Sequence, residues 1–380
     1  MAGGRISEFR VYRFQFPRDR VVGDSQVRTS EANLVALELQ DEAGRVGLGV
    51  MQVLFQSTPA EVDIARIFAE EAFPQIEGRD ASALALQVIR RRGGNVRSMQ
   101  LPFEEAIQHA VWDLFAKAMD LPLWQMLGAQ RTTCPVYASG LDFHLSDHEF
   151  AELFAAAAEA GYRGYKIKVG HPDVQRDLHR LNLLRTAVGH HGRPVMIDAN
   201  EAWTAAQAQA ALALFAKAGH EIYWVEDPLP RDDFDGLRRL RLACPGVRVN
   251  SGEYLDLSGK RKLLEAKACD MVNVHGQISD VMRAGWLANE HNTEVTFGNS
   301  ILEIGVNMAL ALPDVRWLEY SFQNFEHLVE TPFAIRNGLI EGSLAPGHGL
   351  TLSADARHIH RRAVPTVASE MANAPRVRGP

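Results

Sequence analysis

The 380-residue sequence is poor in cysteine and has no long apolar run. Its three cysteines, Cys134, Cys244 and Cys269, are an odd number without the spacing of a disulfide framework, which indicates reduced thiols. No apolar stretch has the length of a signal-peptide core or of a membrane span. No lysine–arginine block is long enough for a nucleic-acid face, and the net charge is −7. The sequence therefore predicts a cytoplasmic protein that binds neither nucleic acid nor membrane.

A glycine-rich phosphate loop is also missing, which counts against an open dinucleotide-binding sheet. From Thr133 onward, short apolar strands alternate with helical stretches of about ten to fifteen residues, a pattern typical of parallel βα units. The predicted strands are Val136–Ser139, Tyr165–Val169, Val195–Asp198, Tyr223–Glu226, Val249–Glu253, Met271–Val274, Glu294–Phe297 and Arg316–Glu319. Eight strands with helices between them favour a closed barrel.

The sequence before this barrel does not show the regular alternation of strand and helix. Two alternating stretches, Ile6–Phe16 and Leu34–Leu39, predict antiparallel strands, and helical periodicity follows between residues 60 and 119. The polar stretch Pro17–Ser30 predicts a mobile loop, and Met51–Pro59 a second loop. We therefore expect a small α+β domain at 1–128, a barrel at 129–338 and a segment at 339–380 that returns to the small domain.

The predicted strand Gly164–Val169 carries two lysines, Lys166 and Lys168. Side chains two apart on a strand share a face and lie about 7 Å apart. On an edge strand both lysines would simply be solvated. Inside a barrel, burial and mutual repulsion would lower their pKa values and give one of them the character of a base near neutral pH.

Three carboxylates stand at the ends of consecutive predicted strands: Asp198, Glu226 and Glu253, at spacings of 28 and 27 residues. In a parallel barrel the carboxyl ends of the strands carry function. Three carboxylates at close range stay ionised only with a cation, and hard oxygen ligands suit Mg²⁺. Beside such a metal, Lys168 could remove the proton α to a substrate carboxylate, and the metal would stabilise the charge that develops on the chelated oxygens.

These motifs in this order resemble the enolase superfamily, mandelate racemase-like subgroup. The resemblance rests on Lys166-x-Lys168, Asp198-x-Asn200, Glu226-Asp-Pro and Gly-Glu253, and on Phe103–Gly128, which is similar to the last helix of the family's capping domain. It implies an α/β fold, a TIM-like (β/α)7β barrel with an α+β capping domain formed by the N-terminal part and the C-terminal tail. It also implies a small-molecule carboxylate substrate chosen by the two loops, and a homo-oligomer, either a dimer or an octamer.

For the site, the resemblance implies Mg²⁺ on Asp198, Glu226 and Glu253. The resemblance also implies that Lys168 is the base and that Lys166 lowers the pKa of Lys168.

The sequence departs from the subgroup at its second base. The subgroup usually has a histidine after the seventh strand, held by an aspartate from the sixth. Asp270 matches that aspartate, but Asn299 stands in the histidine's place, and Asn273 stands where the muconate-lactonizing branch has a lysine. Asparagine does not titrate near pH 7. One candidate substitute is His275 at the end of the sixth strand, which could equally cap a helix.

Further candidates surround these groups. Glu319, which closes the eighth strand, matches the family's acid that hydrogen-bonds the developing enolate; a surface glutamate is the alternative. Tyr137 and Asn200, and from the two loops Arg20 and Phe55, are candidate substrate contacts, although each could be plain packing.

The missing histidine bears on the reaction. Two-base racemisation needs a proton donor opposite Lys168, whereas dehydration can use Lys168 alone. We therefore expect a lyase, a dehydratase of an acid sugar or a related hydroxy acid. A racemase, epimerase or cycloisomerase that uses Lys168 with His275 remains an alternative. A third alternative is a catalytically silent homologue that binds metal and carboxylate. The presence of both lysines argues against this alternative, because binding alone requires neither.

Overall fold

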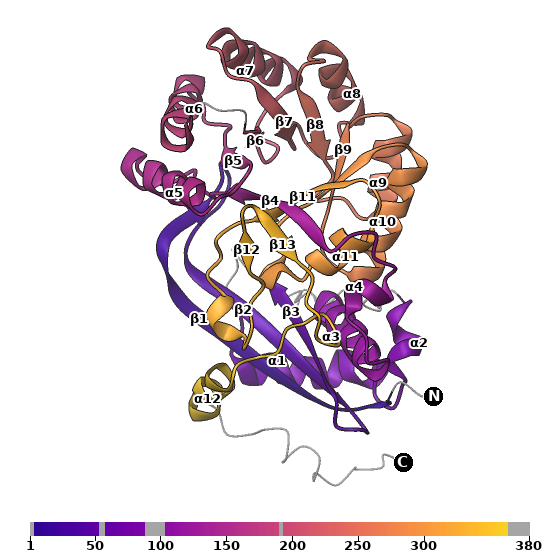
Figure 1. The fold of residues 1–380 in the computed structure, drawn as a ribbon. Coiled ribbons are helices and arrows are strands. Elements are labelled where there is room, and N and C mark those ends of the chain that lie inside the picture. Colours follow the sequence, from indigo (N-terminus) through magenta and orange to yellow (C-terminus); the bar gives the residue numbers. More distant parts are fainter. Residues whose placement is uncertain (1–3, 53–57, 88–102, 190–192, 364–380) are drawn as a thin grey trace, which may run out of the picture.

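The computed structural model describes residues 4–52, 58–87, 103–189 and 193–363. It shows a closed barrel of eight parallel strands next to a three-stranded antiparallel sheet (Figure 1). The barrel strands pair in chain order, and the last pairs with the first. They are β4 (Thr133–Ser139), β5 (Tyr165–Lys168), β6 (Val195–Asp198), β7 (Ile222–Glu226), β8 (Arg248–Ser251), β9 (Met271–Val274), β10 (Glu294–Phe297) and β11 (Val315–Tyr320). The predicted barrel is confirmed.

A ring of helices surrounds these strands, one after each strand from β4 to β10. They are α5 (Asp147–Glu159), α6 (Val174–Val188), α7 (Ala205–Lys217), α8 (Phe234–Ala243), α9 (Leu257–Glu265), α10 (Ile278–Glu290) and α11 (Val306–Ala311). Helix α5 begins with a capping box between Ser146 and Glu149, which satisfies backbone groups at the helix start. None of the helices in the described ranges is long and apolar enough to cross a membrane.

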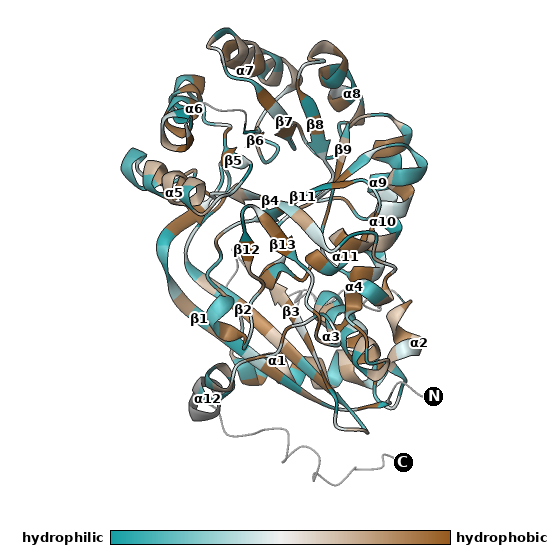
Figure 2. Cartoon of the chain, in the orientation of Figure 1, coloured by the Kyte–Doolittle hydropathy of each residue, from teal (hydrophilic) through white to brown (hydrophobic). Residues whose placement is uncertain are grey.

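The barrel interior is filled by large side chains rather than open. Tyr137, Met196, Trp224 and Met271 form one buried cluster, in which the rings of Tyr137 and Trp224 meet edge to face at 5.3 Å. Figure 2 shows further hydrophobic residues on α11 and on α4 (Leu123–Met126), where the barrel adjoins the capping domain. The polar groups of the site therefore lie above a solid core.

The capping domain is a sheet with helices packed on it. Its strands are β1 (Ile6–Gly23), β2 (Arg28–Asp41) and β3 (Val46–Gln52), and its helices are α1 (Glu61–Ile67), a π-turn (Phe68–Ala72), a 3-10 turn (Phe73–Gln75), α2 (Ala81–Ala85) and α3 (Phe103–Ala118). Helix α3 lies directly against β3 at two glycines. A Cβ on Gly49 would come within 1.8 Å of the carbonyl oxygen of Ala106, and one on Gly47 within 2.2 Å of that of Ala110. Only glycine permits this approach.

The stretch Pro17–Ser30 is not a loop, contrary to the sequence prediction. It forms the outer end of β1, which ends at Gly23, the turn, and the start of β2 at Arg28. We call this two-stranded projection the β1–β2 arm. The arm extends from the capping sheet to the barrel beside β4 and β5 (Figure 1). Its turn docks there, because the Gly23 amide donates to the carbonyl of Leu141 at 2.9 Å. Of the second predicted loop, Met51 lies in β3, and residues 53–57, including Phe55, lie outside the described residues.

The chain after the barrel serves both domains. Strands β12 (Ile335–Arg336) and β13 (Leu339–Glu341) form a hairpin, and β13 pairs with barrel strand β4. Further on, the backbone amide of His348 donates to Asp113 of α3 at 2.8 Å. On the final helix, α12 (Ala354–Ala363), Arg357 donates to Glu38 of β2 at 2.6 Å. The C-terminal segment thus closes the capping domain after contributing a strand to the barrel.

Candidate active site

The loops at the carboxyl ends of the barrel strands share an unusual backbone feature. A residue with positive φ follows each of the eight strands. Three of these residues are glycines, Gly170, Gly252 and Gly276, and the others carry side chains: Leu141, Asn200, Glu201, Asp227, Leu302 and Phe322. Positive φ is uncommon for residues with a side chain, and such strained positions cluster at functional sites. Non-glycine residues with positive φ also precede β9, β10 and β11, at Lys267, Asn292 and Asp314, so the side chains of the carboxyl face must identify the candidate site.

Three carboxylates meet on this face. One oxygen from each of Asp198, Glu226 and Glu253 lies within 4.8 Å of the others. Asp198 and Glu226 are directly opposite each other on β6 and β7, which brings them together by strand register. Glu253 comes two residues after β8. The three residues predicted as metal ligands are thus close together in space.

The electrostatics of this triad fit a divalent cation. Burial, together with the charge on Asp198, raises the pKa of Glu253 to about 8. Burial also raises the pKa of Glu226 well above its ordinary value, although Lys166 opposes it. Raised carboxyl pKa values mean that the protein alone supplies too little positive charge here. The pKa of Asp198 is lowered despite its burial, because Lys168 and Lys166 face it. Three carboxylates, two of them short of positive charge, are a suitable set for Mg²⁺.

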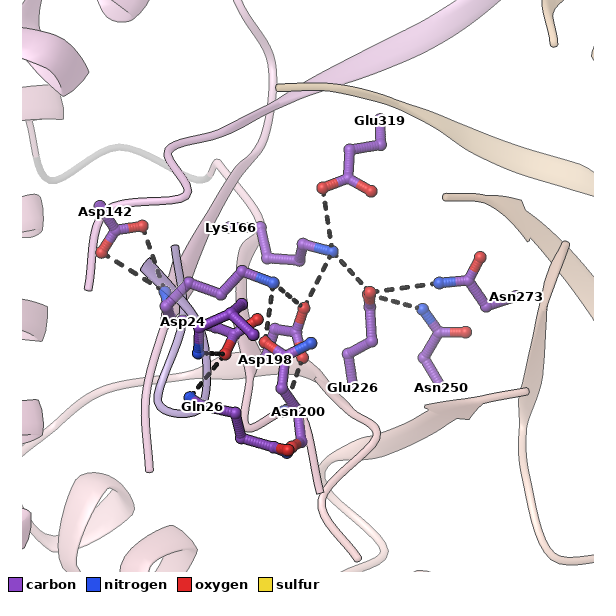
Figure 3. Close-up of polar contacts among 12 residues, drawn as sticks. Asp24, Gln26, Asp142, Lys166, Asp198, Asn200, Glu226, Asn250, Asn273 and Glu319 are labelled. Carbon is purple, nitrogen blue, oxygen red and sulfur yellow. Dashed lines mark hydrogen bonds and ion pairs between the residues drawn. The ribbon is translucent and has the colours of Figure 1, made fainter. Parts of the chain in front are cut away.

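Both predicted lysines bind carboxylates of this cluster, and Figure 3 shows Lys166 among Asp198, Glu226 and Glu319. The Nζ of Lys166 lies 2.5 Å from Glu226, 3.2 Å from Glu319 and 3.4 Å from Asp198. The Nζ of Lys168 donates to Asp198 at 2.5 Å and to the side-chain oxygen of Asn200 at 2.8 Å. Both lysines are buried, so the reading as solvated edge-strand residues is wrong.

The pKa values of the lysines correct the sequence argument. Burial lowers the pKa of both, and Lys166 lowers that of Lys168, as expected. With protein groups alone around them, however, Glu226 and Glu319 raise the pKa of Lys166, and Asp198 raises that of Lys168. These attractions prevail, and both pKa values lie above the ordinary value. The sequence argument counted the two lysines and left out the carboxylates that they face.

A shell of amide and hydroxyl groups holds Glu226 from the far side of the barrel. The amides of Asn250 and Asn273 donate to its two oxygens at 2.9 and 3.2 Å. Thr296 donates to Asn250 at 3.0 Å, and the indole of Trp224 donates to Glu226 at 3.1 Å. Asn273 therefore points inward and orients a carboxylate.

Asn200 connects Lys168 to residues that the sequence reasoning missed. Its side-chain amide donates to the hydroxyl of Tyr254 at 2.8 Å. Its backbone carbonyl accepts from the side chain of Gln26 at the tip of the β1–β2 arm. Tyr254 follows Glu253 directly, and the guanidinium of Arg231 lies 4.4 Å from the centre of its ring. The position of Tyr254 next to a predicted ligand was an available signal, whereas Gln26 had none.

Asp142 is a second residue that the sequence reasoning missed. It is buried in the loop after β4, and its carboxylate oxygens lie 3.2 and 3.4 Å from the backbone amide of Lys168. Burial raises the pKa of Asp142 to about 6. This carboxylate fixes the end of β5 from the neighbouring strand.

Asp270 is not where the second-base hypothesis needs it. It immediately precedes β9, at the amino end of that strand, whereas Asn299 follows the carboxyl end of β10. The Asp270 carboxylate pairs with Arg241 at 2.5 Å and accepts from the amide of Val249 at 2.9 Å. Four residues of strand, roughly 13 Å, separate the two ends of β9. Asp270 therefore belongs to the opposite end of the barrel from the site.

His275 does lie at the carboxyl end of β9. Its Nε2 donates to the backbone carbonyl of Glu253 at 3.0 Å, which leaves Nδ1 unprotonated in the neutral ring. Asn299 accepts from the hydroxyl of Ser321 at 2.8 Å, and Glu319 faces Lys166. These three predicted residues thus share the carboxyl face with the triad.

The remaining candidates lie at the edges of the site. Tyr137 is fully buried beneath Lys166, whose Nζ is 5.3 Å from the centre of its ring. Arg20 on the β1–β2 arm donates to the carbonyls of Gly140 and Phe322, each at 3.4 Å, and so joins the arm to loops of the barrel. In this arrangement Tyr137 packs beneath Lys166, and Arg20 docks the arm on the barrel.

Comparison with known proteins matches both domains. Residues 16–128 match the mandelate racemase / muconate lactonizing enzyme N-terminal domain, and residues 149–356 match the enolase C-terminal domain-like family. The chain is 26% identical over 371 residues to 3,6-anhydro-alpha-L-galactonate cycloisomerase of Streptomyces coelicolor, which covers 93% of this chain and 98% of the relative.

Two solved structures extend this likeness. A candidate mandelate racemase from Mesorhizobium loti is 52% identical, with a TM-score of 0.89 and 98% of each chain covered. L-talarate/galactarate dehydratase from Salmonella typhimurium LT2, liganded with Mg and L-lyxarohydroxamate, is 25% identical, with a TM-score of 0.81 and 93% of each chain covered. Lyases and isomerases thus both occur among the relatives. The chain is an enzyme of the enolase superfamily and belongs to its mandelate racemase/muconate lactonizing enzyme family.

Proposed function

We propose that the protein removes the proton α to a carboxylate in a Mg²⁺-dependent reaction, and that this reaction is the dehydration of an acid sugar or a related hydroxy acid. The observation that carries the proposal is the position of Lys168. Its Nζ lies against the metal-site carboxylate Asp198 at 2.5 Å, on the face where Asn200 also holds it. On the facing strand ends, the position after β10 is an asparagine, Asn299, bound to Ser321.

Each protein group has a role in this reaction. Asp198, Glu226 and Glu253 would hold Mg²⁺, which when bound supplies Lewis-acid stabilisation to the substrate carboxylate. Lys168 accepts the α-proton at Nζ. Lys166, between Glu226 and Glu319, donates to the carboxylate oxygens on which negative charge develops.

Dehydration then needs no second base. The α-carbon–hydrogen bond breaks and the proton passes to Lys168. The bond from the β-carbon to its hydroxyl breaks next, and the Lys168 ammonium returns a proton to the departing oxygen on the same face. Water leaves, and the resulting enol becomes a 2-keto acid. The Salmonella typhimurium relative, a dehydratase, supports this reaction type.

A second candidate is an epimerase or cycloisomerase reaction, and His275 is the observation that favours it. His275 lies at the carboxyl end of β9 with Nδ1 unprotonated in its neutral ring. A group there could exchange a proton with a face of the substrate that Lys168 does not reach. The Streptomyces coelicolor relative, a cycloisomerase, gives this alternative weight.

Proton NMR in D₂O with Mg²⁺, across acid sugars and other α-substituted carboxylates, tests the proposal. We expect loss of an α-proton signal together with a new keto-acid product. Deuterium exchange at the α-carbon without a new compound would favour an epimerase over a dehydratase. Formation of a cyclic isomer would favour a cycloisomerase. Metal-dependent binding of carboxylates with no exchange of any α-proton would overturn both. Lys262→Ala, an exposed lysine on α9, is the matched control for Lys168→Ala.

A further inference from the structure

The three carboxylates of the triad are not equally supported by the fold. Asp198 and Glu226 end neighbouring strands, and the β6–β7 ladder sets their positions. Glu253 lies beyond β8, in a turn that leads to α9. Its neighbour Gly252 has φ +112°, so the chain leaves the strand direction just before the ligand. Contacts outside the ladder must therefore fix Glu253.

Lys260 on α9 provides such contacts. Its side chain is buried, and its Nζ donates to the carbonyl of Gly252 at 2.5 Å and to that of Leu255 at 2.6 Å. These two carbonyls lie on either side of Glu253 in the sequence. Among the described residues, no carboxylate oxygen lies within ion-pair distance of Lys260. A buried ammonium bonded to main-chain oxygens is costly and persists only where those bonds satisfy it.

Other donors and acceptors hold the same turn. His275 donates to the carbonyl of Glu253 at 3.0 Å, so the carbonyls of Gly252, Glu253 and Leu255 each accept from a side chain. On the other side of the chain, Asp227 accepts from the amide of Gly252 at 3.2 Å. The backbone around Glu253 is thus bound from both sides, and Lys260 supplies two of the four bonds.

We propose that Lys260 is a positioning residue that presents the Glu253 carboxylate to the metal ion. The proposal rests on the proposed metal-binding role of Glu253. Lys260 touches neither the metal site nor the substrate; it acts through the two carbonyls that border the ligand. A side chain without donors at this position leaves the Leu255 carbonyl without its side-chain donor and the Gly252 carbonyl with only the amide of Leu255, and the turn then no longer holds Glu253 near Asp198 and Glu226.

The test compares Lys260→Met with Lys262→Met in the full chain. Lys262 is exposed on the same helix, so this control removes one positive charge while leaving the carbonyl contacts intact. Isothermal titration with Mg²⁺ should show at least about tenfold weaker binding for Lys260→Met and wild-type binding for Lys262→Met. Equal Mg²⁺ affinity of Lys260→Met and the wild type would overturn the proposal.

Hydrogen–deuterium exchange of the 252–257 segment, without metal, gives a second readout. In the wild type the amide of Leu255 bonds to the carbonyl of Gly252 at 3.1 Å and should be protected. Exchange there at the rate of an unstructured peptide would overturn the proposal even if Lys260→Met did not fold. A wild-type protein that binds no Mg²⁺ but keeps this amide protected would instead contradict the proposed metal role of the triad. The two failures are thus distinguishable.

Discussion

The two halves of the barrel mouth differ in chemistry. The half built by β5–β8, here called the charged half, carries the side chains of Lys166, Lys168, Asp198, Glu226 and Glu253. The half built by β9–β11, here called the amide half, carries mostly neutral groups, namely Asn273, Thr296, Asn299 and Ser321, with Glu319 and His275 as its titratable members. In the charged half, Lys166 and Lys168 lie within ion-pair distance of Asp198 or Glu226. In the amide half, Asn273, Thr296 and Asn299 make hydrogen bonds through neutral side chains.

This difference supports the proposal of proton transfer at one face of the substrate. The charged half contains the proposed base, its orienting partners and the proposed metal ligands. The amide half orients Glu226 through Asn273 and has an asparagine where a second base would stand. One-sided proton transfer fits dehydration more directly than inversion does. Four variants test this comparison.

Loss of the base in the charged half should have the largest effect. We expect Lys168→Ala to lower the rate of α-proton exchange by about 10³-fold or more, because a positioned general base contributes up to about 10⁴-fold. Exchange measured by NMR in D₂O at saturating Mg²⁺ checks this. Retention of full exchange would remove the role assigned to Lys168, and Lys262→Ala should behave as the wild type.

Loss of support from the amide half should weaken metal binding. Asn273→Leu removes the donor to Glu226 at 3.2 Å, and we expect roughly tenfold weaker Mg²⁺ binding by titration calorimetry. The rate at saturating Mg²⁺ should change far less. Asn182→Leu is the control; this half-buried asparagine on α6 binds Arg185 and His220 and none of the triad. Unchanged affinity would show that the amide half does not orient the ligand.

The attachment of the capping domain to the amide half should depend on pH. His109 of α3 is buried and contacts the carbonyl of Gly276, after β9, at 3.3 Å; burial lowers the pKa of His109 to about 4. The unfolded chain gains a proton on this histidine below its ordinary pKa of 6.5, and the folded protein does not. Stability should therefore fall as the pH falls from 6.5 to 4, by roughly 1.4 kcal/mol per pH unit from this group.

Urea unfolding at pH 7 and pH 5 measures this slope. His109→Gln should show a shallower loss of stability than the wild type over the same interval. An identical pH dependence in the two proteins would mean that His109 is not neutral in the fold. His148→Gln, an exposed histidine on α5, serves as the control.

Removal of the histidine in the amide half should have the smallest effect. At saturating Mg²⁺, His275→Ala should leave α-proton exchange within about threefold of the wild type, because Lys168 performs that step alone. A loss of product inversion with exchange retained would instead assign His275 to an epimerase reaction.

The sequence could predict the charged half because parallel βα units convert regular spacing into proximity. Asp198 and Glu226 are 28 residues apart and directly opposite on adjacent strands. Three of the eight predicted strands, β6, β9 and β10, have the predicted bounds. Buried strands are apolar on both faces, and their limits are easy to see.

Other features depend on contacts that no local pattern encodes. The arm Pro17–Ser30 is a two-stranded ribbon without a continuous buried face, so its strands lack the alternation of a half-buried strand. Gln26 and Asn200 are 174 residues apart and meet only because the turn of the arm docks on the barrel. Asp270 was assigned by its place in a motif, although the predicted strand Met271–Val274 already put it at the amino end of β9.

The C-terminal closure of the capping domain also fixes an order of events during synthesis. Asp113 and His348 are 235 residues apart, and Glu38 and Arg357 are 319 residues apart. At about 5–20 residues per second, the ribosome adds Arg357 roughly 15 to 60 s after Glu38. During that interval β2 already exists while the partner of its buried Glu38 does not, and Asp113 of α3 likewise exists before its partner His348. The ribosome thus completes the barrel before the capping domain, and a chain that stops short of Arg357 carries every proposed site residue beside a capping domain that lacks its last ion pair.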